Sequence, residues 1–275
     1  MLIVGERINS SRKRIRAAIE SRDTAFIQKE AKRQFEAGAT HIDVNAGTSV
    51  SREVDDLKWL VETVQKAVDA PLCIDSPSPE AQAQALKLHK GQPLINSITA
   101  EPERAEVLIP LVKEYDALVV GLTMSAGGMP TSMEERMEAA AKIVEMTGAA
   151  GIDLSRLYFD PAVSAVSADQ KAALDVFATV KGLMETYEGA HTICGLSNIS
   201  YGLPQRNLLN RTYLAMLMAN GLDGVIMDPL EKHMMGTLRA SLVLLGKDEF
   251  CMEYITAERE GRLARSENHK PVEAG

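Results

Sequence analysis

Short apolar runs that end abruptly in small and polar residues recur along this chain. In 192–202, for example, the β-branched stretch Thr-Ile-Cys gives way to Gly-Leu-Ser-Asn and then Ser-Tyr-Gly. This pattern is typical of a strand that is buried on both faces and delivers polar groups at its carboxyl end. We count eight such runs, and segments with helical spacing of apolar residues follow them.

The pattern predicts an alternation of strands and helices. The expected strands are 2–9, 41–45, 71–76, 93–97, 117–124, 157–161, 192–198 and 224–229. The expected helices are 23–38, 54–68, 79–89, 103–114, 132–147, 169–187, 207–220 and 231–245. Units of about thirty residues in this order fit an α/β protein of the (β/α)8 TIM barrel type. A doubly wound open sheet fits less well, because the chain has no G-x-G-x-x-G turn.

Length and composition agree with one barrel. The chain has 275 residues, of which 45% are hydrophobic and 25% charged, and barrels of this size commonly form one domain. We therefore expect a single barrel domain over 1–258 and a polar, flexible tail over 259–275. The formal net charge of −8 argues against a nucleic-acid partner.

The same composition indicates a cytoplasmic protein. No apolar run approaches the ~20 residues that a membrane-spanning helix needs, and the N-terminus has no signal-peptide pattern. The three cysteines, Cys73, Cys194 and Cys251, are far apart in the sequence. They suggest no disulfide framework, which fits a reducing compartment.

Polar side chains gather at the carboxyl ends of the expected strands, where barrels of this type carry their active sites. These residues are Glu6, Asn9, Asp43, Asn45, Asp75, Ser76, Asn96, Ser97, Thr123, Asp160, Ser197, Asn198 and Asp228. A single Asp at such a position can simply cap the next helix. A whole ring of buried acids and amides must either satisfy itself or bind a polar ligand.

The residue types in this ring favour some reactions over others. Carboxylates and carboxamides suit a flat heterocycle such as a pterin or a purine, because one carboxylate can accept parallel hydrogen bonds from a ring N–H and an exocyclic amine. No lysine stands at a strand end, which disfavours Schiff-base chemistry, and the histidines fall at strand starts, in helices or in the tail. A zinc site is not indicated, although a magnesium site from Glu6, Asp43 and Asp75 is conceivable. Arg206 and Arg211 follow the seventh strand and could meet an anionic substrate tail.

Several motifs along 1–255 match one family in unbroken order. They are Gly5-Glu6-Arg7-Ile8-Asn9, Asp43-Val44-Asn45-Ala46-Gly47, Asp75-Ser76, Ile95-Asn96-Ser97, Gly121-Leu122-Thr123-Met124, Asp160-Pro161, Gly195-Leu196-Ser197-Asn198-Ile199-Ser200 and Asn210-Arg211-Thr212. The chain resembles the pterin-binding barrel methyltransferases that move a methyl group between methyltetrahydrofolate and the cobalt of a corrinoid protein. Each motif is weak alone, and their common order makes the resemblance specific.

The resemblance implies roles for individual residues. Asp75, Asn96 and Asp160 match the family's pterin-binding side chains, and Asn198 matches a mobile Asn that approaches N5, the nitrogen that carries the methyl group. Ser197 and Arg206 match the wall beside it. With the ring residues, the candidate substrate-binding set is Asp75, Asn96, Asp160, Asn198, Ser197, Arg206, Glu6 and Asp43. The candidate catalytic residues are Asn198 and Asp160, and no metal ligand is expected.

The resemblance also implies a reaction and a partner. Tetrahydrofolate or methyltetrahydrofolate is the expected substrate, and the corrinoid (cobalamin) is carried by a partner protein, so the enzyme needs no nucleophile of its own. A homodimer is expected, and the partner would belong to acetyl-CoA synthesis or to a demethylase system such as an O-demethylase. The sequence does not set the direction of transfer. Two alternatives stay open: a pterin enzyme similar to dihydropteroate synthase, and a non-catalytic folate-binding subunit.

Overall fold

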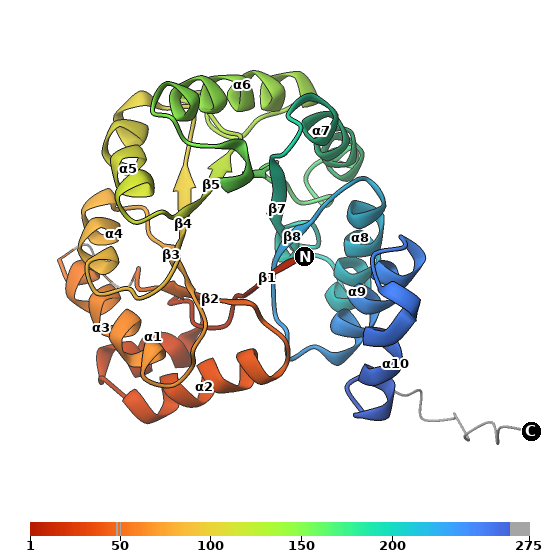
Figure 1. Cartoon of the computed structure of the whole chain (residues 1–275), viewed down its shortest axis with the longest axis horizontal. Helices are drawn as coiled ribbons and strands as arrows, with labels where there is room; N and C mark the ends of the chain where they lie inside the picture. The colour runs from red at the N-terminus through yellow and green to blue at the C-terminus, as the bar shows by residue number, and fades with distance from the viewer. Residues whose placement is uncertain (48, 50, 265–275) are drawn as a thin grey trace, which may run out of the picture.

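The strands form one closed barrel. The computed structural model describes residues 1–47, 49 and 51–264. Within these residues, eight parallel strands pair in chain order, and the last pairs with the first (Figure 1). The strands are β1 Leu2–Gly5, β2 His41–Asn45, β3 Leu72–Asp75, β4 Leu94–Ile98, β5 Leu118–Leu122, β6 Leu157–Asp160, β7 His191–Gly195 and β8 Gly224–Met227. The expected (β/α)8 barrel is therefore confirmed.

The helices form a ring around this barrel (Figure 1). They are α1 Lys13–Glu20, α2 Thr24–Glu36, α3 Glu53–Gln65, α4 Pro79–Leu86, α5 Pro102–Glu114, α6 Met133–Ala149, α7 Ala172–Thr186, α8 Arg206–Ala219, α9 Lys232–Leu244 and α10 Met252–Arg259. Short 3-10 turns lie at η1 Leu154–Arg156, η2 Leu196–Asn198 and η3 Glu249–Cys251. Because η2 directly follows β7, it holds the seventh strand's polar residues at the carboxyl end of the barrel.

Apolar side chains fill the barrel from both sides of the strands. One cluster, which includes Val4, Cys73, Leu94 and Ile193, lies on the inward faces of the strands. Two larger clusters join the outward faces to the helices. The strands are consequently covered on both faces, as the near-continuous apolar runs in the sequence indicate.

Side chains at the helix starts explain several helix boundaries. Ser78 accepts a hydrogen bond from the Ala81 amide at 3.2 Å, and Pro79 stands in the first turn of α4. Ser132 likewise accepts from the Glu135 amide at 3.3 Å. These caps satisfy amides that have no partner inside a helix. They place the starts of α4 and α6 within one residue of the positions expected from the sequence.

The first strand is shorter than expected, and two helices were not expected at all. The first strand ends at Gly5 rather than at residue 9, because α2 packs against it there. The Arg7 amide donates to Gln34 Oε1 at 2.9 Å, and a Cβ on Gly5 would lie only 2.6 Å from that oxygen. Helices α1 and α10 were not expected. Both are only eight residues long, and the residue at the N-cap position of each, Arg12 and Cys251, makes no capping hydrogen bond, so the usual helix-start signal is missing.

The expected tail lies only partly within the described residues. α10 ends at Arg259, and 265–275 fall outside the described residues, so the flexibility expected for that segment is not addressed. In the part of the chain that is described, no helix combines the length and the apolar character needed to cross a bilayer.

Candidate functional site

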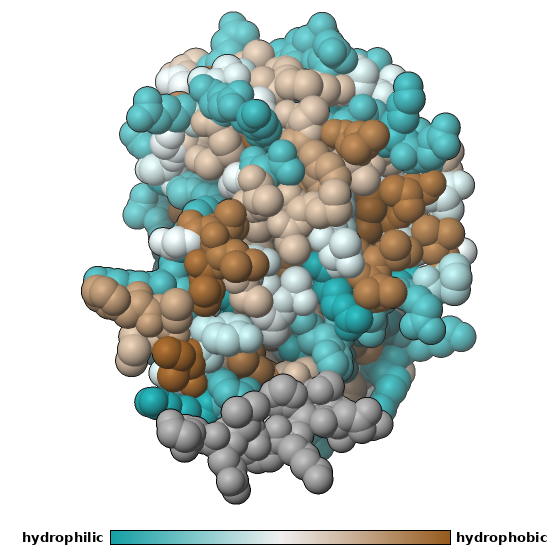
Figure 2. All heavy atoms as spheres, turned by 90° about the vertical axis from the view of Figure 1, so that its right-hand side faces the viewer, coloured by the Kyte–Doolittle hydropathy of each residue, from teal (hydrophilic) through white to brown (hydrophobic). Residues whose placement is uncertain are grey.

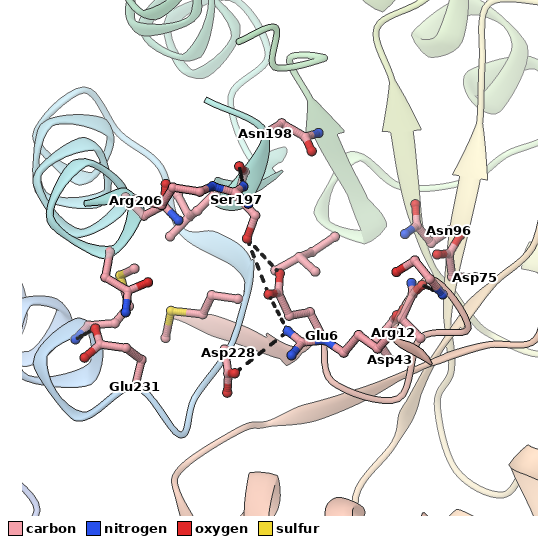
Figure 3. A pocket seen from close by; sticks show the side chains of 18 residues that line it. Glu6, Arg12, Asp43, Asp75, Asn96, Ser197, Asn198, Arg206, Asp228 and Glu231 are labelled. Atoms are coloured by element: carbon pink, nitrogen blue, oxygen red, sulfur yellow. Dashed lines mark hydrogen bonds and ion pairs between the residues drawn. The ribbon is translucent and has the colours of Figure 1, made fainter. Parts of the chain in front are cut away.

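A cavity of about 590 Å³ opens at the carboxyl ends of the strands (Figure 3). Its polar lining comes from opposite sides of the barrel. The residues around it are Glu6, Asn9, Ser11, Arg12, Asp43, Asp75, Asn96, Leu196, Ser197, Asn198, Arg206, Asn207, Asn210, Ile226, Met227, Asp228, Glu231 and Met234. Seven of the eight candidate substrate-binding residues are among them, and Asp160 is the exception.

Two carboxylates from neighbouring strands lie on one side of this cavity. Asp43 on β2 is 2% exposed, and burial together with the nearby Asp75 raises its pKa well above the usual value. Burial also raises the pKa of Asp75, while Asn45 Nδ2 donates to its Oδ2 at 3.0 Å. In the described part of the chain, Asp43 Oδ1 has no hydrogen-bond partner. The arrangement therefore leaves acceptor capacity for a ligand that brings N–H groups.

An ionic network lies beside these carboxylates, at the ends of β1 and β8. Arg12 donates to Glu6 Oε1 at 3.1 Å, and Arg7 donates to Asp228 Oδ2 at 2.6 Å. Ser197 Oγ lies 3.4 Å from both carboxylate oxygens of Glu6, as the dashed lines in Figure 3 show. Burial raises the pKa of Glu6, which Arg12 partly offsets. Glu6 and Ser197 thus contact each other before any ligand arrives.

Asp160 faces a smaller, adjoining cavity of about 280 Å³. This cavity shares Asn198 and Ile226 with the larger one, and the thioether side chains of Met124 and Met129 contribute to its wall. Burial raises the pKa of Asp160 to about 6, and the Ala162 amide, which donates to Asp160 Oδ1 at 2.9 Å, partly offsets that rise. Together the two cavities can hold a ligand that reaches from β3 to β6.

Asn198 stands at the boundary between the two cavities. It is the last residue of η2 and is exposed. No hydrogen bond of its side chain to another described residue is present. The turn beneath it is held by Arg206, which donates to the Ser197 carbonyl at 2.5 Å and to Ser200 Oγ at 3.0 Å. The Asn198 side-chain amide is therefore free to rotate, while the backbone that carries it is held in place.

Other expected residues have different surroundings. Arg206 lines the larger cavity, but its guanidinium is engaged with the η2 turn. Arg211 lines neither cavity, so the expected contact with a substrate tail is not supported for it. Ser76 Oγ donates to Glu53 Oε1 at 2.5 Å behind the strand end, and Thr123 donates to the Asp160 carbonyl at 2.9 Å. These two side chains secure the strand ends from outside the cavities.

Two arginines that sequence reasoning missed, the partly buried Arg104 and the buried Arg136, hold the loops after the acid-bearing strands. Arg104 on α5 donates to the carbonyls of Ser97, Pro77 and Ser76 at 2.6, 2.6 and 2.9 Å. It thereby ties the chain after Asp75 to the chain after Asn96. A helical arginine carries no sequence signal that would distinguish this role from an ordinary surface position.

The second arginine, Arg136 on α6, is 2% exposed. It donates to the carbonyls of Pro161 at 2.7 Å, Ser132 at 2.9 Å and Ala162 at 3.3 Å. Ala162 has a positive φ of 53°, which is unusual for a residue with a side chain. Arg136 thus holds the backbone whose amide contacts the Asp160 carboxylate.

Replacing Arg136 with methionine should lower the free energy of unfolding by about 2–4 kcal/mol, because three backbone carbonyls would lose their buried donor. Lys142→Met, an exposed substitution on the same helix, is the matched control. Urea denaturation followed by circular dichroism measures both. Equal stability of the two variants would contradict the role assigned to Arg136.

The described residues offer no obvious metal centre. Among them, no group of three or more His, Cys, Asp and Glu side chains is arranged to hold a metal ion. The conceivable magnesium site of Glu6, Asp43 and Asp75 therefore finds no support. The arrangement that is present suits a planar ligand with several N–H groups.

Comparison with known proteins agrees with this geometry. Residues 5–228 match the family described as pterin binding enzyme. The chain is 39% identical over 265 residues to a methylcorrinoid:tetrahydrofolate methyltransferase of Eubacterium limosum. The aligned residues cover 96% of this chain and 98% of that protein. It is also 28% identical over 239 residues to methionine synthase of Mycobacterium tuberculosis, covering 82% of this chain and 20% of that protein.

Solved structures show the same fold at lower sequence identity. Dihydropteroate synthase of Xanthomonas albilineans with 4-aminobenzoic acid superimposes with a TM-score of 0.66 at 21% identity, covering 90% of this chain and 92% of that one. The same enzyme in complex with 7,8-dihydropteroate gives a TM-score of 0.65 at 20% identity, covering 90% and 94% of the two chains. At this identity the likeness concerns the fold alone.

Proposed function

The chain belongs to the pterin-binding enzyme family, and from this premise we propose that it is a methyltransferase that moves a methyl group between N5 of tetrahydrofolate and the cobalt of a corrinoid protein. The observation that carries the proposal is the similarity, over almost the whole of both chains, to a methylcorrinoid:tetrahydrofolate methyltransferase. The open ring of acids and amides at the barrel end supplies the chemistry. The direction of transfer is left open.

We propose that the pterin ring lies across the two adjoining cavities. The Asp160 carboxylate would accept hydrogen bonds from the ring N3–H and the neighbouring amino group, a paired arrangement that suits a carboxylate. Asp75 on β3 and Asn96 on β4 are paired with each other in the sheet, and both would contact another edge of the ring. Glu6, Asp43, Ser197 and Arg206 would border the same ligand.

Asn198 is the proposed catalytic residue at N5. As the bond between N5 and the methyl group breaks, charge changes on that nitrogen, and an amide donor aimed at it stabilises the transition state more than the ground state. The exposed position of Asn198 lets its amide turn toward the ligand. Asp160, by holding the ring, would fix where N5 lies and would belong to the hydrogen-bonded path for its proton.

The corrinoid of the partner protein supplies the cobalt that accepts or donates the methyl group. This chain's own contribution is to bind the folate, orient N5 toward the opening and hold the amide beside it. That division of work agrees with a ring that lacks Cys, His and Lys among the residues at the strand ends.

Turnover tests the proposal directly. The purified protein is mixed with methyltetrahydrofolate and free cob(I)alamin, and formation of methylcobalamin is followed by its absorbance. We expect enzyme-dependent methyl transfer, and transfer in the opposite direction from methylcobalamin to tetrahydrofolate. Intact folate binding without transfer in either direction would instead identify a non-catalytic folate-binding subunit.

We further propose a homodimer that works in the cytoplasm with a corrinoid partner from acetyl-CoA synthesis or from a demethylase system such as an O-demethylase. The family resemblance supports these finer statements. Figure 2 shows apolar patches on the face that carries α8 to α10. Leu244 at the end of α9 and Phe250 in η3 are 86% and 84% exposed. A second copy of the chain would cover such side chains. The described cysteines are free thiols, as a reducing compartment requires.

Folate affinity should depend on pH because the pKa of Asp160 is about 6. Above that value the carboxylate can accept two hydrogen bonds, whereas the protonated acid accepts fewer, so affinity falls as pH falls. Between about pH 7 and pH 5 the dissociation constant should rise about tenfold if only the ionised form binds. Calorimetry at both pH values measures this, with circular dichroism to verify folding. An affinity that is constant or rises toward acid pH would contradict the role of Asp160.

A further inference from the structure

A second cavity with a basic lining lies outside the barrel, between α2 and α9. It has a volume of about 330 Å³, and we name it the α2–α9 groove. Four cationic side chains line it, namely Arg33, Lys232, Arg239 and Arg262, against a single acid, Glu36. This excess of positive charge is notable in a chain whose formal net charge is −8.

Arg239 is the residue that distinguishes this groove from an ordinary charged surface. It is only 9% exposed. No hydrogen bond or ion pair joins its guanidinium to another described residue. Arginine offers five donors and no acceptor, and an arginine this deeply buried is normally paired. Burial and the nearby positive charge of Arg262 lower the pKa of Arg239, which Glu253 and Glu260 partly offset.

The other three cations keep donors available. Arg33 uses Nη1 to contact Glu30 at 2.6 Å, and Arg262 uses Nε to contact Glu260 at 2.6 Å. Each guanidinium therefore retains further N–H groups. Lys232 is exposed at the start of α9, and no ion pair joins it to another described residue. The groove thus combines the unpaired guanidinium of a largely buried arginine with three nearby cations.

We propose that the α2–α9 groove binds a multivalent anion whose charged groups are carboxylates or phosphates. The Arg239 guanidinium would take one such group through paired N–H donors, which is the strongest geometry available between arginine and either anion. Lys232 and Arg262 would contact the remaining charges. The bound anion would supply the acceptors that the protein itself does not place around Arg239.

The groove borders the active-site cavity but is distinct from it. Pro229 and Leu230 line the groove, whereas Asp228 and Glu231 of the same turn between β8 and α9 line the larger cavity. Figure 1 shows α2 and α9 as neighbours at that side of the barrel. The anion site does not rest on the proposed methyltransferase function, and it is tested by binding alone.

Isothermal titration calorimetry of the full chain with inorganic pyrophosphate and, separately, with citrate tests the proposal at constant ionic strength. We expect binding of at least one anion. Arg239→Met, which keeps the size and apolar stem of the side chain, should weaken it at least ~10-fold, the size expected for a lost charge-assisted pair. Lys232→Met should weaken it several-fold, so the test does not depend on one variant.

Lys32→Met is the matched control, because Lys32 is an exposed lysine on α2 that does not line the groove. Its anion affinity should equal that of the unmodified chain. Preference for pyrophosphate or for citrate identifies the phosphate or the carboxylate source. The proposal is overturned if neither anion binds, if folded Arg239→Met and Lys232→Met bind as well as the unmodified chain, or if Lys32→Met weakens binding equally.

Discussion

Asp160→Ala abolishes measurable folate binding if the pterin ring lies as proposed. The Asp160 carboxylate faces its cavity with one backbone amide donor, from Ala162, and so has lone pairs left for the ring. Losing a charged acceptor of two hydrogen bonds should weaken binding ~100-fold or more. Calorimetry with tetrahydrofolate under anaerobic conditions measures the dissociation constant.

The control for this substitution is Asp55→Ala, which removes an exposed carboxylate from α3 that lines neither cavity. It should leave folate affinity unchanged. Circular dichroism and thermal unfolding must show that Asp160→Ala is folded. A folded Asp160→Ala that binds folate within a few-fold of the unmodified chain would exclude the proposed orientation of the pterin.

Asn198→Ala should slow methyl transfer by ~10²-fold or more while changing folate affinity only a few-fold. The amide is proposed to stabilise charge that develops at N5 in the transition state, and removal of one such donor typically has this kinetic effect. Single-turnover absorbance measurements with cobalamin give the rate, and calorimetry gives the affinity. The separation of these two effects is the signature of a transition-state donor.

Asn207→Ala provides the comparison, because Asn207 on α8 lines the same large cavity but has no proposed role at N5. We expect little change in its transfer rate. Equal losses of folate affinity and rate in Asn198→Ala would show that Asn198 binds the ground state instead. A rate for Asn198→Ala as high as that of Asn207→Ala would remove Asn198 from the mechanism.

Much of the fold could be predicted because it depends on local patterns. A strand that is buried on both faces appears in the sequence as an apolar run, and a capped helix start such as Ser78-Pro79 can be recognised from adjacent residues. The barrel order follows from the repeated alternation of these elements. The helices α1 and α10 were missed because Arg12 and Cys251, which precede them, are not typical N-cap residues, whereas Ser78 marks the equally short α4.

The candidate site could be predicted as a set of residues but not as an arrangement. Polar groups at strand ends must meet at one end of a parallel barrel, so Asp75, Asn96 and Asn198 could be grouped from their positions alone. The hydrogen-bond and ion-pair partners of the site residues could not be predicted in this way. Arg206 was expected beside the substrate, yet its guanidinium holds the η2 turn, a contact that depends on how α8 packs.

The sequence by itself determined the alternation of strands and helices, the ring of acids and amides, and the family, because each depends on neighbouring residues or on their order. Only the tertiary structure decided that Asp75 raises the proton affinity of Asp43, that Asp160 faces a separate cavity, and that Arg104 and Arg136 hold the loops after the strand ends. The same holds for the unpaired Arg239. These features join residues far apart in the chain, and distance and burial, which set their energies, exist only once the barrel has closed.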